Sequence, residues 1–476
     1  MKSVLFLAAE AAPFIKTGGL GDVVGSLPKE LNKRGMDARI ILPLYNQVKA
    51  QKKQMTFLGS ITVPLGWRNQ YCGLYQLEKD AVTYYFCDNE YYFCRPGIYG
   101  YGDDAERFAF FSRAVLEALP HIQFVPDILH CNDWHTGVVP VLLKAHYHKE
   151  KRYEGISTVL TIHNIQYQGV FDVVVLGDLL ELDKTAYFAD PALYFNGKAN
   201  FLKMGIEFAD LLTTVSPSYL EEIVTPQGGC QLGDLLKKRS QNMIGIANGV
   251  DYDKYNPVYD KAIYKKYSAQ SWEYKAENKC KLQQELGLAV DATIPLIAMV
   301  SRMVDAKGFS LLTESLEKLL CMKVQLVILG TGEAHYEEFF RKAAAKNPQG
   351  VSVSTVFDEN LAHRIYAASD LYLMPSLHEP CGLSQMMALR YGSIPIVRMT
   401  GGLKDTITPF SETTGEGNGF CFSSYTPGAL LEAVAQALKL YYDRTVWGKL
   451  VTNAMNADNS WDHSAGEYFK MYSRLE

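Results

Sequence analysis

The sequence predicts an α/β protein made of two Rossmann-like domains, and three observations support this prediction. Apolar strand-like runs alternate with amphipathic helix-like stretches in both halves of the chain. Its 476 residues are too many for one ordinary hydrophobic core. Glycine-rich basic segments follow strand-like runs in each half, where open α/β sheets bind their ligands.

The strand-like runs fall into two series. The first half contains Val4–Ala9, Ala38–Leu42, Asp127–His130, Thr158–His163 and Leu211–Val215. The second half contains Leu296–Ser301, Gln325–Gly330, Leu371–Pro375 and Ile394–Val397. Between the first two runs, Asp22–Arg34 has the pattern of an amphipathic helix, and Gly35 is suited to end it. Apolar strands separated by helices imply parallel sheets that are covered on both faces.

The domain boundaries follow from turn signals. We expect an N-terminal domain over residues 1–244 and a second domain over residues 245–455, because Asn248–Asp251 has the pattern of a turn before a new section. Residues 456–476 are expected to return to the first domain, with a helix over Trp461–Arg474. The tract Tyr252–Glu277 is rich in Tyr and Lys and lacks strand patterns, so it is expected to be an insertion.

Composition excludes several classes of protein. A formal net charge of −5 gives no general attraction for nucleic acid, so any anion site must be local. The nine cysteines are scattered without C-x-x-C pairs, which indicates reduced thiols in a cytoplasmic protein. Glu10 interrupts the first apolar run too early for a secretory signal, and no run reaches the ~18 apolar residues of a membrane span.

Three basic or glycine-rich segments are candidate anion sites. They contain Lys16 with Gly18 and Gly19, then Arg302 with Lys307, and finally Thr400, Gly401, Gly402 and Leu403. Glycine pairs let backbone N–H groups approach a ligand, and the N-terminus of a helix attracts anions. A diphosphate held between the two domains is the simplest interpretation of this pattern.

The segment around Glu379 is the strongest candidate for chemistry. It follows a strand-like run, and Pro380 disfavours helix at the preceding residue, so the carboxylate is expected in a loop at the end of a strand. The alternative is a carboxylate that caps the next helix. Cys381 lacks an evident Cys–His arrangement, which favours a packed or ligand-lining thiol over a covalent catalyst.

Two further residues have open interpretations. His163 ends a strand-like run and suits either contact with a ligand hydroxyl or a half-buried structural role. Asp133 is a candidate acceptor of hydroxyl hydrogen bonds or an N-cap. The histidines form no H-E-x-x-H or other zinc pattern, so no metal site is expected.

A dinucleotide-binding dehydrogenase is disfavoured. Gly330-Thr331-Gly332 begins the required G-x-G-x-x-G pattern, but His335 occupies the third glycine position. Near Gly19 and Gly21 that position is Val24, and no P-loop is present.

Seven motifs together resemble one family. In chain order they are KTGGLGDV at 16–23, HCNDWHT at 130–136, TIHNIQYQG at 161–169, NGVD at 248–251, SRMVDAKG at 301–308, PSLHEPCGL at 375–383 and RMTGGLKDT at 398–406. This series resembles that of bacterial glycogen synthases and plant starch synthases over nearly the whole chain. Two positions depart from the common pattern: Leu377 stands where Arg is frequent, and Asp305 puts a carboxylate near the basic pair.

The resemblance implies an α/β GT-B glycosyltransferase, with two Rossmann-like domains that face each other across a deep cleft. It implies glucosyl transfer from ADP-glucose to the non-reducing end of an α-1,4-glucan, with retained configuration and without a metal or other cofactor. The implied partners are thus ADP-glucose and glycogen or a maltooligosaccharide, with no nucleic acid or membrane. A related GT-B enzyme using another sugar nucleotide, or a non-catalytic glucan-binding protein, is the alternative.

The same resemblance implies a role for each candidate residue. Lys16, Gly18, Gly19, Asn248, Cys381 and Thr400 would contact the donor, and Gly401, Gly402 and Leu403 would supply backbone N–H groups to it. The catalytic set would be Glu379 as essential glutamate, His163 at the transferred glucose, and Arg302 and Lys307 as diphosphate clamp. Glu10 and Asp133 would face the acceptor.

Overall fold

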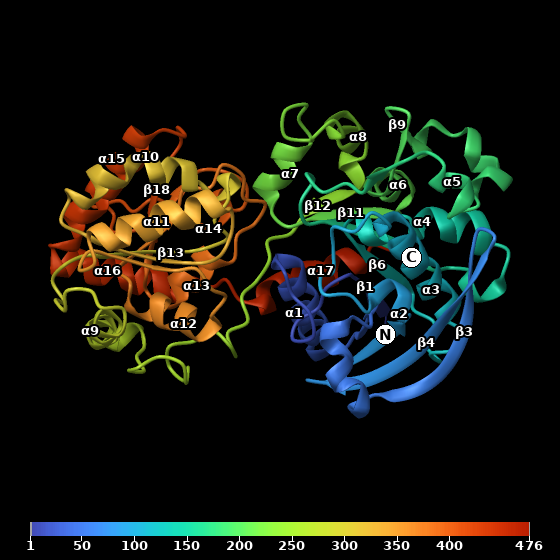
Figure 1. Ribbon diagram of the computed structural model, residues 1–476, viewed down its shortest axis with the longest axis horizontal. Coiled ribbons are helices and arrows are strands. Elements are labelled where there is room, and N and C mark those ends of the chain that lie inside the picture. Colours follow the sequence, from blue (N-terminus) through green and yellow to red (C-terminus); the bar gives the residue numbers. More distant parts are fainter. Residues whose placement is uncertain (1, 476) are drawn as a thin grey trace. The chain divides into compact units, whose positions relative to one another are not determined.

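The computed structural model describes residues 2–475, which form two compact α/β units (Figure 1). One unit comprises Met1–Ile246 with Trp461–Glu476, and the other comprises Ala247–Ser460. These bounds differ from the expected ones by a few residues. Residues 456–460 belong to the second unit because Ser460 forms a β-bridge with Val250.

A nine-stranded sheet forms the centre of the first unit, in the order β12-β11-β7-β6-β1-β2-β5-β4-β3. Its strands are β1 (Ser3–Leu7), β2 (Asp37–Pro43), β3 (Thr56–Leu65), β4 (Arg68–Lys79), β5 (Val82–Asp88), β6 (Ile128–Asn132), β7 (Ser157–Ile162), β11 (Leu211–Thr214) and β12 (Met243–Gly245). The pairs from β12 to β5 are parallel, whereas β5, β4 and β3 pair antiparallel. The β3–β4 hairpin was not expected from the sequence.

Helices and a small second sheet complete this unit. The helices are α1 (Gly19–Lys33), α2 (Glu90–Phe93), α3 (Asp104–Ala118), α4 (Val139–Leu142), α5 (Val175–Asp178), α6 (Phe201–Phe208), α7 (Pro217–Ile223), α8 (Gly233–Lys238) and α17 (Trp461–Tyr472). The small sheet contains β8 (Val170–Phe171), β9 (Tyr194–Phe195) and β10 (Lys198–Asn200). The C-terminal helix α17 packs against α1, and the Tyr472 hydroxyl lies 2.5 Å from His130 Nδ1 on β6. The chain therefore returns to the first unit, as expected.

The second unit contains a six-stranded parallel sheet in the order β15-β14-β13-β16-β17-β18. Its strands are β13 (Leu296–Val300), β14 (Gln325–Leu329), β15 (Val351–Ser354), β16 (Leu371–Met374), β17 (Ile394–Arg398) and β18 (Phe420–Phe422). Its helices are α9 (Lys275–Glu285), α10 (Phe309–Leu320), α11 (Ala334–Lys346), α12 (Glu359–Ala368), α13 (Ser384–Arg390), α14 (Leu403–Thr406), α15 (Pro427–Tyr441) and α16 (Arg444–Asn456). In Figure 1, α10, α11 and α15 cover one face of the sheet, and α9, α12 and α13 cover the other. The central strands β14 and β16 are buried throughout as a result, whereas the edge strand β15 is mostly half-buried.

Each sheet has a topological switch point, where successive connections leave a strand pair in opposite directions. It lies between β1 and β6 in the first unit and between β13 and β16 in the second. Ligands of open α/β sheets bind at such points, beyond the carboxyl ends of the strands. The loops that follow these four strands are therefore where a functional site is expected in each unit. Within residues 2–475, none of the helices combines the length and hydropathy needed to cross a bilayer.

Candidate functional site

In the first unit, Glu10 organises the loop between β1 and α1. Its buried carboxylate accepts hydrogen bonds from the Thr17 backbone N–H (2.5 Å), the Thr17 hydroxyl (2.7 Å) and the Gly18 N–H (3.2 Å). The Tyr99 hydroxyl donates a fourth hydrogen bond of 2.7 Å. Gly18 is the N-cap of α1 and Gly19 its first residue, so the glycine pair lies at a helix N-terminus as predicted. The Glu10 carboxylate therefore accepts the backbone N–H groups of Thr17 and Gly18 at the start of this turn.

Lys16 is the exposed cation of the same loop. Its ammonium lies 2.7 Å from the Asp22 carboxylate in the first turn of α1, and about 29% of its side chain is exposed. The pairing leaves the lysine accessible but lowers the net positive charge at this end of the helix.

The loops after β6 and β7 meet through Asp133 and His163. Asp133 is buried, has a left-handed φ of 55°, and accepts the backbone N–H of His163 at 2.8 Å. Asp133 is the N-cap residue of the 3₁₀ turn that follows, but its side chain makes no capping hydrogen bond to that turn. Burial raises the pKa of Asp133 to about 7.

The tautomer of His163 follows from its neighbour Asn132. The Asn132 amide nitrogen donates to the Leu7 and His130 carbonyls at 3.1 Å each, so its Oδ1 is the acceptor for His163 Nε2 at 2.9 Å. His163 Nε2 therefore carries the proton and Nδ1 is an acceptor. Burial lowers the pKa of His163 to about 3, which keeps the imidazole neutral at pH 7. A neutral acceptor of this kind suits a ligand hydroxyl.

In the second unit, Lys307 and Glu379 meet at the switch point. The Lys307 ammonium donates to both carboxylate oxygens of Glu379, at 2.8 and 2.6 Å, and the Ser376 hydroxyl donates to Oε2 at 3.0 Å. Only 6% of the Glu379 side chain is exposed, against 22% for Lys307. Helix α13 has Leu383 as its N-cap residue, so Glu379 does not cap that helix and this alternative is wrong.

Backbone contacts hold the two loops of this ion pair together. Gly308 has a φ of 83°, and a Cβ there would lie 2.2 Å from the Pro375 carbonyl oxygen, so only glycine fits. The Leu377 N–H donates to the Ala306 carbonyl at 2.9 Å. Arg302 lies at the start of the same loop, and its side chain is exposed. Within residues 2–475, Arg302 forms no ion pair.

The turn at residues 400–403 packs directly onto the Glu379 loop. The Gly402 N–H donates to the Glu379 and Pro380 carbonyls at 3.1 Å each, and the Leu403 N–H donates to the Thr400 carbonyl at 3.1 Å. We expected Gly402 and Leu403 to offer these N–H groups to a ligand, and in this structure both donate to the protein itself. A Cβ on Gly401 would lie 2.0 Å from the Glu379 carbonyl oxygen, so the glycines allow the two loops to approach.

Cys381 and Asn248 are buried neighbours in this unit. Burial raises the pKa of the Cys381 thiol to about 12, although hydrogen bonds from Asn248 oppose the shift. A thiol with this pKa is not a nucleophile at neutral pH, in agreement with a lining or packing role. Among the described residues, Asn248 Oδ1 is buried without a hydrogen-bond partner.

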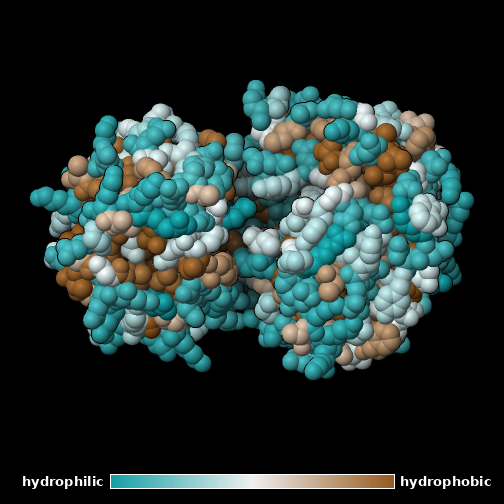
Figure 2. All heavy atoms as spheres, viewed as in Figure 1, coloured by the Kyte–Doolittle hydropathy of each residue, from teal (hydrophilic) through white to brown (hydrophobic). Residues whose placement is uncertain are grey.

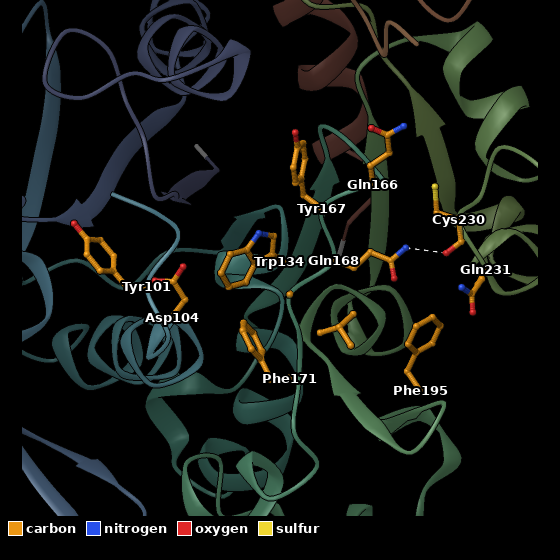
Figure 3. Close-up of a pocket in the computed structure, with 12 residues that line it drawn as sticks. Tyr101, Asp104, Trp134, Gln166, Tyr167, Gln168, Phe171, Phe195, Cys230 and Gln231 are labelled. Atoms are coloured by element: carbon orange, nitrogen blue, oxygen red, sulfur yellow. Dashed lines mark hydrogen bonds between the residues drawn. The ribbon is translucent and has the colours of Figure 1, made fainter. Parts of the chain in front are cut away.

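A groove of about 580 Å³ lies beside Trp134 in the first unit (Figure 3). It is lined by Tyr101, Asp104, Trp134, Gln166, Tyr167, Gln168, Gly169, Val170, Phe171, Phe195, Cys230 and Gln231. A Cβ on Gly169 would lie 2.5 Å from the Trp134 ring, so this glycine lets the indole pack on the backbone.

The structure thus joins most of the predicted residues within each unit. It brings Glu10 to Gly18, Asp133 to His163, and Lys307 to Glu379 and the 400–403 turn. Three polar partners were not expected from the sequence, namely Tyr99, Asn132 and Ser376. Tyr99 is one of 30 tyrosines, and nothing in its local pattern marks it. Across residues 2–475, no three His, Cys, Asp or Glu side chains are grouped as metal ligands would be.

Comparison with known proteins gives a consistent result for the whole chain. Residues 3–238 match the family model of the starch synthase catalytic domain, and residues 273–453 match glycosyl transferases group 1. A glycogen synthase of Clostridium botulinum (strain Alaska E43 / Type E3) is 53% identical over 474 residues, covering 99% of both chains. One from Desulforamulus reducens is 50% identical over 473 residues, covering 99% of this chain and 98% of that one.

A solved structure agrees with these relatives. The catalytic domain of starch synthase IV from Arabidopsis thaliana, bound to ADP and acarbose, superposes with a TM-score of 0.93 at 34% identity. The match covers 100% of this chain and 99% of that chain.

Proposed function

Because the chain belongs to the glycogen and starch synthase family, we propose that it transfers glucose from ADP-glucose to the non-reducing end of an α-1,4-glucan. It is a glycosyltransferase with the GT-B fold. The observation that carries the proposal is the Lys307–Glu379 ion pair at the switch point of the second sheet, in a chain about half identical to glycogen synthases. The neighbour bound to ADP and acarbose supports a nucleotide diphosphate and a glucan as ligand classes.

The second unit supplies the charges that leaving-group departure requires. When the glucosyl–phosphate bond breaks, negative charge grows on the ADP diphosphate, and preorganised cations stabilise it. Lys307 is held by two hydrogen bonds to Glu379, so it is preorganised, and exposed Arg302 is its proposed partner. The Glu379 carboxylate is the proposed counter-charge for the oxocarbenium-like glucosyl group. Asn248, Cys381, Thr400 and Gly401 are proposed to line the donor.

The first unit supplies neutral hydrogen-bonding groups as well as a cation. Neutral His163, with Nδ1 as an acceptor, is proposed to bind a hydroxyl of the transferred glucose. Lys16, with the glycine pair at the start of α1, is proposed to contact the donor. Glu10 and Asp133 are proposed to act on the acceptor side through the groups they hold, the Thr17–Gly18 turn and the His163 backbone.

The proposed reaction needs no metal, because Arg302 and Lys307 supply the positive charge that a divalent cation would otherwise provide. Retention of configuration is part of the proposal, with the departing phosphate accepting the proton of the attacking hydroxyl on the same face. A cytoplasmic location is proposed as well, supported by nine cysteines that are all free thiols.

A transfer assay tests this function. The protein is incubated with glycogen and ADP-, UDP- or GDP-glucose labelled in the glucose, and the label bound to polymer is measured. We expect incorporation from ADP-glucose, unchanged in excess EDTA. Incorporation only from another sugar nucleotide would show that the donor is wrong, and strict dependence on Mg²⁺ would contradict the metal-free reaction. Glycogen binding without any transfer would identify a glucan-binding protein instead.

A further inference from the structure

We propose that Asn132 is a positioning residue, which holds the His163 ring in the tautomer that accepts a hydrogen bond from the transferred sugar. The inference rests on the proposed function, because that function makes His163 a ligand of the transferred glucose. It also gives the site a means of selection, since an acceptor at this place requires a sugar that offers a hydroxyl hydrogen.

Asn132 joins three neighbouring strands of the first sheet. It is the last residue of β6, and only 1% of it is exposed. Its amide nitrogen donates to the Leu7 carbonyl at the end of β1 and to the His130 carbonyl in β6, at 3.1 Å each. Its Oδ1 lies 2.9 Å from Nε2 of His163, the residue directly after β7. A single amide therefore ties together the ends of β7, β6 and β1, from which the candidate loops of the first unit leave.

The orientation of this amide is fixed by its surroundings. The two partners of its nitrogen are carbonyl oxygens, which accept hydrogen bonds and donate none. If the amide turned by 180°, its Oδ1 would face both carbonyl oxygens, and each of these buried acceptors would lose a donor. The backbone is held as well, because the Thr136 hydroxyl accepts the Asn132 N–H at 2.7 Å and donates to the Asn132 carbonyl at 3.0 Å. Asn132 Oδ1 thus stays toward His163, and Nε2 has to be the donor.

Asp133 and Asn132 act on different parts of His163. Asp133 accepts the His163 backbone N–H at 2.8 Å, which places the loop, whereas Asn132 contacts the ring. Among residues 2–475, no carboxylate forms a hydrogen bond with this ring. The ring therefore has a neutral partner, and its tautomer depends on Asn132.

A neutral partner matters because positive charge develops on the glucosyl group when its bond to phosphate breaks. An imidazolium nearby would oppose that charge, whereas the lone pair of a neutral Nδ1 does not. A carboxylate hydrogen-bonded to Nε2 would favour the imidazolium. The amide of Asn132 instead fixes the tautomer without favouring a second proton on the ring.

The other titratable groups around His163 are consistent with a neutral ring. His130 on β6 and His135 in the turn after β6 both lie near His163, and burial lowers the pKa of each to about 3. Asp133 has a pKa raised by burial to about 7, and the Glu10 carboxylate in the loop after β1 adds to this shift. Because Asp133 titrates in the range of the assay, pH profiles are compared as ratios to the wild type.

The kinetics of Asn132→Ala and Asn132→Asp test the proposal. In Asn132→Ala, Nε2 loses its acceptor and both neutral tautomers become populated, so KM for ADP-glucose should rise about two- to tenfold while kcat changes less. In Asn132→Asp, the new carboxylate favours the imidazolium. The kcat of this variant relative to the wild type should therefore fall as the pH is lowered from 8 to 5, by up to about tenfold. A structural defect alone would not produce this pH dependence.

An NMR spectrum of the free protein reports the tautomer without any substrate. Histidine labelled with ¹⁵N gives separate signals for protonated and unprotonated ring nitrogens, and His163→Gln identifies the signals of His163. We expect a protonated Nε2 and an unprotonated Nδ1 in the wild type, and a mixture of the two tautomers in Asn132→Ala. Both nitrogens should be protonated at pH 5 in Asn132→Asp.

Two variants are matched controls. Asn32 has the same kind of contacts as Asn132, since its amide nitrogen donates to the Ala38 and Ala81 carbonyls at 3.1 Å each and its Oδ1 accepts the Ala38 N–H at 2.7 Å. Asn32→Ala should lower Tm and leave KM and the histidine signals unchanged. Figure 2 shows mostly hydrophilic side chains at the surface over β3 and β4, so a carboxylate added there stays solvated. Asn69→Asp, at an exposed position of β4, adds the same charge as Asn132→Asp and should leave the pH profile unchanged.

The proposal is overturned if Asn132→Ala keeps the wild-type tautomer and KM, or if Asn32→Ala raises KM as much as Asn132→Ala does. If Asn132→Asp does not fold, Asn132→Ala decides the question through both measurements. If the tautomer changes as expected but the wild type transfers glucose from no donor, the proposed function fails and Asn132 still positions His163.

Discussion

Replacing Glu379 tests the centre of the proposed catalytic arrangement. Its carboxylate accepts two hydrogen bonds from Lys307 and one from Ser376, in a position where only 6% of the side chain is exposed. Glu379→Ala leaves the Lys307 ammonium unpaired, whereas Glu379→Gln keeps a side chain of the same size without its charge. The two variants therefore separate the charge from the packing.

The size of the stability effect follows from the burial of the pair. Removing one partner of a buried ion pair costs ~3–5 kcal/mol. The Lys307 side chain is 22% exposed and is able to rehydrate, so we expect about 2–3 kcal/mol for Glu379→Ala. For a unit of about 200 residues this lowers Tm by about 5–10 °C. In the double variant with Lys307→Met, the loss should be smaller than the sum of the single losses by about 1–3 kcal/mol.

The kinetic effect should be similar in free energy to the stability loss of Glu379→Ala. We expect both Glu379 variants to lower kcat by on the order of a hundredfold, about 2.7 kcal/mol, because the charge acts in the transition state. ADP affinity, measured by calorimetry, should stay within a few-fold of wild type, since Lys307 is retained. A folded Glu379→Gln with near-wild-type kcat, or fully additive stability losses, would refute the reasoning.

Three other perturbations have defined outcomes. Arg302→Ala should lower kcat/KM for ADP-glucose by about 2–4 kcal/mol of transition-state free energy. Its Tm should stay unchanged because the Arg302 side chain is exposed. Unaltered kinetics would show that Arg302 is not part of the diphosphate clamp. Asp133 has a folded-state pKa of about 7 against about 4 when unfolded, so it favours the folded state at low pH and this contribution is lost as the pH rises through 7. Asp133→Asn should remove that part of the decline in Tm between pH 4 and 7, and an identical pH profile would contradict the buried position. Tyr472→Phe removes the hydroxyl that is hydrogen-bonded to His130, so it should lower the unfolding free energy by about 1 kcal/mol without changing kcat. A large loss of kcat would show that α17 contributes to catalysis as well as to the stability of the first unit.

The sequence predicted the central parallel strands of both sheets because most of them are apolar runs, whereas β5, β12, β15 and β18 were not predicted. Strands β1, β13 and β16 are buried over nearly their whole length, so each appears in the sequence as an almost uninterrupted hydrophobic stretch. The β3–β4 hairpin was missed because it carries exposed polar positions, with Thr56, Thr62 and Asn69 among its exposed residues. The start of α1 was expected at Asp22 and lies at Gly19, since glycine is a weak helix signal even where it begins a helix.

For the site, positions at strand ends were predictable and side-chain partners were not. The loop location of Glu379 followed from Pro380, a local backbone constraint. Its pairing with Lys307, 72 positions earlier in the chain, depends on which strands are neighbours, and the order β13-β16 is a property of the whole sheet. Tyr99 reaches Glu10 across a still longer separation, and one sequence contains no signal for such a pair.

The two glycine-rich turns lead to one conclusion about phosphate recognition. Pattern alone suggested that backbone N–H groups bind the anion, yet Glu10 accepts the Thr17 and Gly18 N–H groups, and the Glu379 carbonyl accepts the Gly402 N–H. In both units the glycines thus bring a buried glutamate and a turn together, and the N–H groups are used to hold that arrangement. We therefore propose that the positive charge that binds a diphosphate comes from side chains, Arg302 and Lys307 in particular. Side-chain cations at exposed positions are screened by salt, so KM for ADP-glucose should rise steeply with ionic strength, and the slope should fall in Arg302→Ala. If KM for ADP-glucose does not depend on ionic strength, the backbone N–H groups of the two turns, and not the side-chain cations, bind the diphosphate.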